Sequence, residues 1–250
     1  MSGRIEMMGC VIDNLTMAQT LDRVSALIAS GQPHQHVVVN VDKLVKASRD
    51  PELREAINRC ALVSVDGMPV VWASRLLGKP LVERVAGIDL FDALVARASE
   101  SGWRVYFLGA RREVVEAVGT LYASRYPSLQ IAGWRDGYWP PEEDPAVAES
   151  IAAARPDLLF VAISSPRKEQ FLARWQGVMR VPFAMGVGGS FDVVTGRVGR
   201  APRWMQRSGL EWFYRFLQEP RRMFRRYFIE DAAFIGLVLR ELRRGRSVRP

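Results

Sequence analysis

Short apolar runs that alternate with amphipathic helical patterns constrain the fold of this chain more than any other feature. HVVVN, ALVSVDG, RVYFLGA, DLLFVAISS and VPFAMGVGG read as strands, and segments with helical spacing lie between them. In TMAQTLDRVSALIAS, apolar residues recur at Met17, Leu21, Val24 and Ile28, after Thr16 as the expected N-cap. This alternation predicts an α/β, Rossmann-like fold with a mainly parallel sheet flanked by helices.

The expected elements fill most of the chain up to residue 196. Further strands are expected near MMGCVID and LQIAGW, and further helices in DPELREAINRC, MPVVWASRLLG, IDLFDALVARASESG, residues 112–126, a segment ending at Ala154, and PRKEQFLARW. The stretch RDGYWPPEEDP is expected to be an exposed loop. Strands end and arginines begin at VTGRVGRAP, so we place a boundary between an α/β domain, residues 1–196, and a helical appendage, residues 197–250.

The net charge of +8 comes entirely from the appendage. Residues 1–196 carry 21 Lys and Arg against 22 Asp and Glu, whereas residues 197–250 carry 14 Arg and no Lys against five acidic residues. The chain is therefore a nearly neutral body followed by a strongly basic segment.

Several protein classes are disfavoured by the sequence. The longest apolar run, AAFIGLVL, is far below the roughly 18 residues needed to span a bilayer, and the N-terminus has no secretory h-region, so a cytoplasmic location is expected. Cys10 and Cys60 lie in apolar contexts without a CxxC and are predicted to be buried free thiols. No Cys or carboxylate lies at metal-ligand spacing from His34 and His36, so we interpret the two histidines as surface residues and predict no metal site.

Polar and glycine residues gather where the predicted strands end. Ligands of open α/β sheets bind beyond the carboxyl ends of the strands, where loops and unpaired backbone N–H groups are available. The residues at these ends are Asn40, Asp66, Gly109, Ser164, Ser165, Gly186, Gly188 and Gly189. Asp66 is a candidate general base, and its alternative role is to cap the following helix. The GVGG glycines are candidates for phosphate contact, with a plain tight turn as the alternative.

Arg84, in the loop VERVAG, is a candidate partner for a phosphate or carboxylate, or else a solvated surface arginine. The chain contains no GxSxG, Walker A or DxD sequence. The missing DxD removes the carboxylate pair by which many sugar-nucleotide enzymes hold a divalent metal. If a diphosphate leaves at this site, arginines and backbone N–H groups must therefore stabilise it.

The appendage segment GLEWFYRFLQEPRRMFRRYF separates aromatic from basic residues when it is drawn as one helix. Trp212, Phe213, Phe216, Leu217, Met223, Phe224, Tyr227 and Phe228 fall on one side, and Arg215, Arg221, Arg222, Arg225 and Arg226 on the other. Pro220 leaves open whether the helix is continuous. Three interpretations remain open: an anionic membrane surface, nucleic-acid phosphates, or packing of the aromatic face on the body. Nucleic acid is the least favoured, because no nucleic-acid-binding motif accompanies the charge.

Blocks spread over residues 5–228 resemble the WecG/TagA/CpsF glycosyltransferases, glycosyltransferase family 26. The blocks are VDGMPVVWASRLLG, ERVAGIDLFDAL, RVYFLGARREVVEAV, DLLFVAISSPRKEQF and GVGGSFDVVTGRVGRAPRWMQRSGLEWFYRFLQEPRRMFRRY. The resemblance implies an inverting, metal-independent transfer of a hexose or N-acetylhexosamine from a UDP-sugar to a polyprenyl-diphosphate-linked saccharide in bacterial cell-surface or exopolysaccharide synthesis. It also implies that no cofactor takes part and that the enzyme is peripheral on the cytoplasmic face of the inner membrane.

The same resemblance assigns roles to individual residues. Residues 1–196 then bind the UDP-sugar, with Asp66 as the base and with Asn40, Arg84, Lys168 and Glu169 as further donor-site residues. Gly109, Gly186, Gly188 and Gly189 join them as substrate-binding candidates because of their place at the strand ends. Residues 197–250 then contact the membrane and the acceptor diphosphate through Arg215, Arg221, Arg222, Arg225 and Arg226. Two departures bear on the sugar: Val38 stands where the family usually has Thr, and PRKE where it often has PKQE.

A second hypothesis is a non-catalytic nucleotide-binding module that the basic appendage recruits to a membrane or to nucleic acid. The sequence leaves open the donor sugar, the acceptor saccharide and the linkage, because discrimination among sugars depends on single pocket contacts. It also leaves open the oligomeric state, since self-association off the membrane is one way to cover the aromatic surface of the appendage.

Overall fold

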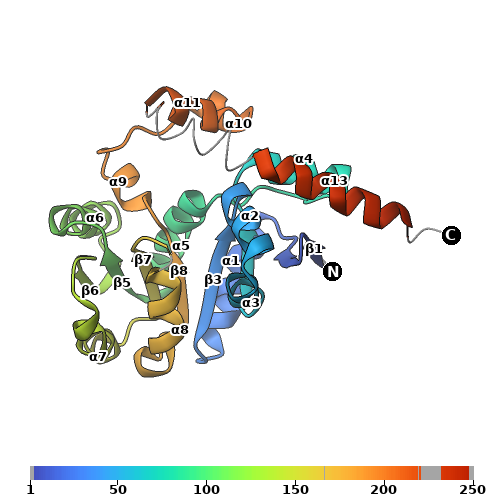
Figure 1. Ribbon diagram of the computed structural model, residues 1–250. Coiled ribbons are helices and arrows are strands. Elements are labelled where there is room, and N and C mark those ends of the chain that lie inside the picture. The colour runs from blue at the N-terminus through green and yellow to red at the C-terminus, as the bar shows by residue number, and fades with distance from the viewer. Residues whose placement is uncertain (1–2, 166, 219, 221–231, 248–250) are drawn as a thin grey trace. The chain divides into compact units, whose positions relative to one another are not determined.

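The computed structural model describes residues 3–165, 167–218, 220 and 232–247 (Figure 1). The strands are β1 (Arg4–Met7), β2 (Cys10–Asp13), β3 (His34–Val39), β4 (Leu62–Val65), β5 (Arg104–Gly109), β6 (Gln130–Arg135), β7 (Leu158–Ala162) and β8 (Phe183–Gly186). The helices are α1 (Met17–Ala29), α2 (Val41–Arg49), α3 (Pro51–Asn58), α4 (Met68–Leu76), α5 (Gly87–Ser101), α6 (Arg112–Arg125), α7 (Asp144–Ala154), α8 (Arg167–Met179), α9 (Ser190–Val194), α10 (Arg203–Arg207), α11 (Glu211–Gln218) and α13 (Ala232–Ser247), with a 3-10 turn, η1 (Pro141–Glu143).

Six strands form one sheet in the order β4-β3-β8-β7-β5-β6. The pairs β3–β8, β8–β7, β7–β5 and β5–β6 are parallel, and helices connect and flank the strands (Figure 1). The predicted α/β, Rossmann-like class is therefore confirmed. Gly109 pairs with Ala162, and Val161 pairs with Gly186, so β5, β7 and β8 end at one edge of the sheet. This is the edge at which ligands of such folds bind.

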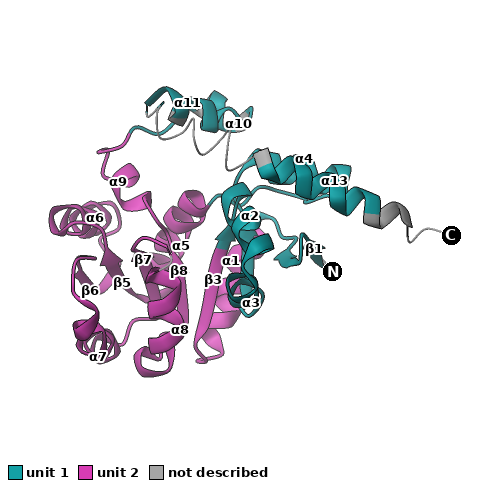
Figure 2. Cartoon of the chain, in the orientation of Figure 1, with its two compact units in different colours: residues 1–16, 38–86, 199–250 teal, residues 17–37, 87–198 magenta. Residues whose placement is uncertain are grey.

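The contacts within the chain divide it into two compact units (Figure 2). Unit 1 comprises residues 1–16, 38–86 and 199–250, and unit 2 comprises residues 17–37 and 87–198. Residues 199–250 thus belong to the same unit as β4 and α4. The division of the chain into a donor-binding domain and an appendage with its own function stays a prediction.

The core of unit 2 is built on both faces of its strands. On one face Phe107 of β5 and Phe160 of β7 pack with Phe91 of α5, and the Phe91 and Phe160 ring centroids lie 4.7 Å apart. On the other face Leu108 of β5 belongs to a buried cluster with residues of α7 and α8, including Phe171. Because successive strand residues point to opposite faces and both faces are covered, the strands are continuous apolar runs in the sequence.

The opening segment differs from its prediction, because it forms a hairpin of two strands rather than one strand. β1 and β2 pair antiparallel from Arg4 opposite Asp13 to Met7 opposite Cys10. The two turn residues, Met8 and Gly9, have φ values of 52° and 79°. Two-residue hairpins need positive φ at such positions, and Asn-Gly or Asp-Gly is their usual signal. In Met-Gly only the glycine matches this signal, so the sequence does not predict the turn.

Helix α2 was also missing from the predicted order of elements. It starts directly after β3, and a single residue, Asp50, separates it from α3. Asp50 ends one helix and caps the next, since its carboxylate accepts a hydrogen bond from the Leu53 N–H at 3.0 Å. Two short helices joined in this way leave no loop composition between them for the sequence to show.

His36 is buried, with 2% of its surface exposed, so its interpretation as a surface residue is wrong. It lies on β3, which has β4 on one side and β8 on the other. Its ring stacks on Phe183 with 6.1 Å between the ring centroids. β3 has a neighbouring strand on each side, and half of its side chains, those of His36, Val37 and Val39, are buried.

Cys10 and Cys60 are free and buried, as predicted. Burial raises the pKa of the Cys10 thiol from 9.0 to about 11, although Arg54 acts in the opposite direction. Below pH 9 both the folded and the unfolded chain carry the neutral thiol, so the ionisation of Cys10 does not lower the free energy of unfolding. Between pH 9 and 11 only the unfolded chain ionises, so the free energy of unfolding falls by about 2–3 kcal/mol in all.

Urea unfolding of the wild type and of Cys10→Ser across this pH range measures that contribution. The wild type is expected to lose about 2–3 kcal/mol more than the variant, because the serine hydroxyl does not titrate there. Equal losses in the two proteins would contradict the raised pKa of Cys10.

Candidate active site

Asp66 directly follows β4, at the carboxyl end of the strand. Its backbone N–H donates a hydrogen bond to the Val39 carbonyl at the end of β3, with N and O 2.9 Å apart. The N-cap position of α4 belongs to Gly67, whose φ is 106°. Asp66 is therefore not the N-cap residue of α4, as the helix-capping alternative required. The Asp66 side chain is 38% exposed and is thus accessible to a ligand.

Arg84 lies between two carboxylates. Its Nη1 donates a hydrogen bond to Glu211 Oε2 at 3.2 Å and lies 3.8 Å from Asp66 Oδ1. The exposed fractions of the Arg84 and Glu211 side chains are 15% and 14%. The alternative of a solvated surface arginine is therefore wrong. Two carboxylates and one guanidinium meet here in a partly desolvated setting, where charge interactions are stronger than in water.

Glu211 was not predicted as a site residue. It is the first residue of α11 and one of five acidic residues in the last fifth of the chain. Its only signal in the sequence is its position in the GLEW block of the family resemblance, with an acidic side chain in a segment dominated by arginine. Sequence spacing gave no way to connect it with Arg84, which lies 127 residues earlier.

Asn40 ends β3 and caps α2. Its Oδ1 accepts a hydrogen bond from the Lys43 N–H at 2.9 Å. This contact is a structural one that satisfies an N–H group of the first helical turn. Its predicted role in donor binding stays a prediction. Asn40, Asp66 and Arg84 all belong to unit 1.

Lys168 and Glu169 form a second polar group, in unit 2. Lys168 Nζ lies 3.5 Å from Glu169 Oε1, and Ser165 Oγ donates a hydrogen bond to Glu169 Oε2 at 2.7 Å. The two charged side chains are only 12% and 15% exposed. The lysine chain lies against Gly186 at the end of β8, where an added Cβ would come within 2.6 Å of Lys168 Cε. The absent side chain at Gly186 thus makes room for Lys168.

The remaining predicted glycines also lie in unit 2. Gly109 ends β5 against the backbone of Ala162. Gly188 and Gly189 are exposed in the turn between β8 and α9, and Gly189 is the N-cap of α9. The structure thus places Gly109, Lys168, Glu169, Gly186, Gly188 and Gly189 in unit 2, near the carboxyl ends of β5, β7 and β8. Their contact with a donor stays a prediction.

The predicted arginines of the appendage are described only in part. Arg215 belongs to α11, and its side chain lies outside the described part of the chain, as do Arg221, Arg222, Arg225 and Arg226 entirely. The apolar neighbours on α11 are exposed, with Trp212 at 37%, Phe213 at 40% and Leu217 at 61%. This exposure does not support the interpretation in which the aromatic face packs fully on the body. Among the described residues, no helix is both long and apolar enough to cross a membrane.

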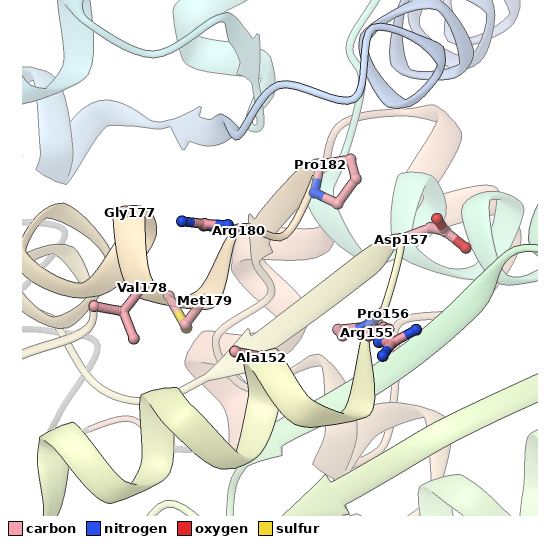
Figure 3. A pocket seen from close by; sticks show the side chains of 9 residues that line it. All are labelled: Ala152, Arg155, Pro156, Asp157, Gly177, Val178, Met179, Arg180 and Pro182. Atoms are coloured by element: carbon pink, nitrogen blue, oxygen red, sulfur yellow. The ribbon is translucent and has the colours of Figure 1, made fainter.

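A separate depression of about 720 Å³ lies at the opposite edge of the sheet in unit 2 (Figure 3). Its lining comes from the ends of α7 and α8 and from the residues that lead into β7 and β8, namely Asp157 and Pro182 (Figure 3). Arg155 and Arg180 also line it. It contains none of the residues that the sequence predicts, and it lies at the amino ends of its strands, where such folds do not usually bind ligands.

Comparison with known proteins identifies the family of the chain. The model of the glycosyl transferase WecG/TagA/CpsF family matches residues 5–248. Two similar proteins are both named N-acetylglucosaminyldiphosphoundecaprenol N-acetyl-beta-D-mannosaminyltransferase. The one from Bacillus subtilis (strain 168) is 37% identical over 73% of this chain and 70% of its own length. The one from Bacillus spizizenii is 38% identical over 74% of this chain and 72% of its own length. The chain belongs to the WecG/TagA/CpsF family of glycosyl transferases.

Proposed function

We propose that this glycosyltransferase moves a hexosamine from a UDP-sugar to a polyprenyl-diphosphate-linked saccharide in bacterial cell-surface polysaccharide synthesis, with inversion at the anomeric carbon and without a metal. The two relatives are named for transfer of N-acetylmannosamine to N-acetylglucosaminyldiphosphoundecaprenol, so these are the first donor sugar and acceptor to test. Family membership argues against the alternative of a non-catalytic nucleotide-binding module.

The observation that carries the proposal is the accessible carboxylate of Asp66 at a strand end, with Arg84 Nη1 3.8 Å from it. In the proposed step, Asp66 takes the proton of the acceptor hydroxyl while that oxygen bonds to the anomeric carbon. The bond between this carbon and the diphosphate oxygen breaks, and its electron pair leaves with UDP. Attack from the side opposite the leaving group inverts the configuration.

The leaving UDP gains charge as this bond breaks. The chain has no DxD sequence, so the proposed stabilisation comes from cationic side chains and backbone N–H groups. Arg84 is the described candidate nearest to the base. Donor contacts are proposed for Asn40, Gly109, Lys168, Glu169, Gly186, Gly188 and Gly189, and acceptor-diphosphate contacts for Arg215, Arg221, Arg222, Arg225 and Arg226.

The proposed location is the cytoplasmic face of the inner membrane, with the basic segment on anionic lipid. Exposed Trp212, Phe213 and Leu217 support this proposal, because contiguous exposed apolar side chains mark contact surfaces and aromatic rings suit the headgroup zone. Arginine adds attraction to anionic headgroups. Self-association off the membrane remains the alternative way to cover this face, and nucleic acid is not proposed as a partner.

A donor screen tests the proposed function. The purified full chain is incubated with a panel of UDP-sugars, including UDP-N-acetylmannosamine, and a short-chain lipid-diphosphate N-acetylglucosamine acceptor, with and without EDTA. We expect one donor to yield a disaccharide-lipid product and free UDP at the same rate in both conditions. UDP binding without product for every donor would contradict the transferase proposal, and loss of product in EDTA would contradict metal independence.

A further inference from the structure

Arg84 Nη1 is shared unequally between two carboxylates. It makes a hydrogen bond with Glu211 at 3.2 Å, whereas its 3.8 Å separation from Asp66 is an ion pair without hydrogen-bond geometry. We infer that Glu211 is a positioning residue, which holds Arg84 near Asp66 and prevents Arg84 from closing on it. The inference rests on the proposed role of Asp66 as the base.

The three side chains differ in burial, and this difference strengthens the Arg84–Glu211 hydrogen bond relative to the Arg84–Asp66 ion pair. Arg84 and Glu211 are about 15% exposed, so their hydrogen bond is poorly screened by water, while Asp66 is 38% exposed. The buried partner therefore holds the guanidinium more firmly than the exposed one does. The Asp66 side chain remains accessible to an incoming hydroxyl, with the Arg84 guanidinium 3.8 Å away.

Glu211 is fixed in this position by the packing of its own segment on α4. The backbone of Gly209 lies so close to α4 that an added Cβ would come within 2.6 Å of Met68 Cγ. Met205 of α10 is buried, and the Leu210 N–H donates to the Met205 carbonyl at 2.8 Å. The turn between α10 and α11 is thus seated beside the first residue of α4, which follows Asp66 and Gly67.

This contact gives the C-terminal segment two roles: it packs on α4, and it supplies the carboxylate that holds Arg84. When the α10–α11 turn packs on α4, it also brings the carboxylate that sets Arg84. Without that carboxylate, Asp66 would be the acidic partner left to Arg84 among the described residues, and Arg84 could shorten its 3.8 Å separation from Asp66 to a hydrogen bond. An Asp66 carboxylate engaged in this way is a weaker base toward a hydroxyl.

Glu211→Ala and Glu211→Gln test the inference in the full chain. Loss of a hydrogen bond to a charged group in Glu211→Ala is expected to lower kcat by roughly 10- to 100-fold. The donor KM should stay within about twofold, because a positioning effect on the base acts mainly in the transition state. Glu211→Gln should recover most of kcat, since its amide oxygen still accepts from Arg84.

Glu241→Ala is the matched control. Glu241 of α13 is also partly buried, accepts from the Met8 N–H at 2.7 Å and lies 3.2 Å from Lys79 Nζ, so it likewise ties C-terminal residues to earlier parts of unit 1. None of its described contacts involves Asp66 or Arg84. We expect Glu241→Ala to lower the melting temperature while kcat stays near that of the wild type.

Three outcomes would overturn the inference: an unchanged kcat in Glu211→Ala, a Glu211→Gln variant as slow as Glu211→Ala, or an equal kcat loss in Glu241→Ala. The second would assign Glu211 a direct proton-transfer or charge role, and the third would indicate general loosening of unit 1. Failure of the proposed function looks different, because the wild type itself would then make no product or Asp66→Asn would stay active.

Discussion

Asp66→Asn is expected to lower kcat for sugar transfer by roughly 10²- to 10⁴-fold, the usual contribution of a general base. The amide has nearly the shape of the carboxylate but cannot take a proton from the acceptor hydroxyl. The Asp66 side chain is 38% exposed, and the hydrogen bond from its backbone N–H to Val39 does not depend on the side chain, so the substitution should leave the fold intact. The dissociation constant for UDP should change little, because the predicted donor contacts come from other side chains.

The measurement pairs initial rates of transfer with UDP titration by calorimetry and with thermal unfolding. Asp42→Asn is the matched control, since Asp42 is another acidic residue of unit 1 and pairs with Lys46 on the surface of α2. It should leave all three measurements near the wild-type values. Near-normal turnover in Asp66→Asn would remove the base role. Loss of UDP binding in parallel with kcat would make Asp66 a binding residue instead.

Replacing Arg221, Arg222, Arg225 and Arg226 with Gln is expected to weaken binding to anionic vesicles by roughly a thousandfold. Each arginine near an anionic surface contributes about 1 kcal/mol, so four contribute about 4 kcal/mol. These residues lie outside the described part of the chain, and the prediction comes from their place on the basic side of the segment. Binding to neutral vesicles should hardly change.

Substitution is a sharper test than deletion of residues 197–250. Residues of that segment help to build unit 1, as Phe234 and Val238 are buried and Glu241 pairs with Lys79, so its removal would also open the fold. The control replaces four exposed arginines elsewhere, Arg49, Arg111, Arg155 and Arg180, with Gln. Both variants lose the same net charge. Equal vesicle binding by the two variants would contradict a specific membrane role for the segment.

The parallel sheet could be predicted because the burial of its strands and helices leaves a regular pattern of apolar residues in the sequence. Strands such as β5 and β7 are covered by helices on both faces, so Phe107 and Leu108 are both buried although they point in opposite directions. Continuous apolar runs follow from that covering, and amphipathic spacing follows from helices that cover the sheet with one face. Asp66 and Gly186 could be placed at strand ends for the same reason.

The roles of individual polar residues could be predicted less well, because they depend on contacts between distant parts of the chain. The Asn40 side chain caps a helix that the sequence analysis did not expect. His36 is buried because its strand became central in the sheet, which is decided by the order of pairing and not by local composition. Glu211 meets Arg84 across 127 residues, and no local pattern encodes such a pairing.

The most direct test of the central claim, a single displacement assisted by Asp66, is the anomeric configuration of the first-formed product, measured by NMR during turnover of the wild-type chain. Attack by a deprotonated acceptor opposite the leaving UDP predicts a configuration opposite to that of the donor sugar. A product with the donor's own configuration would show that the sugar was displaced twice or from the same face, and this result would contradict the account.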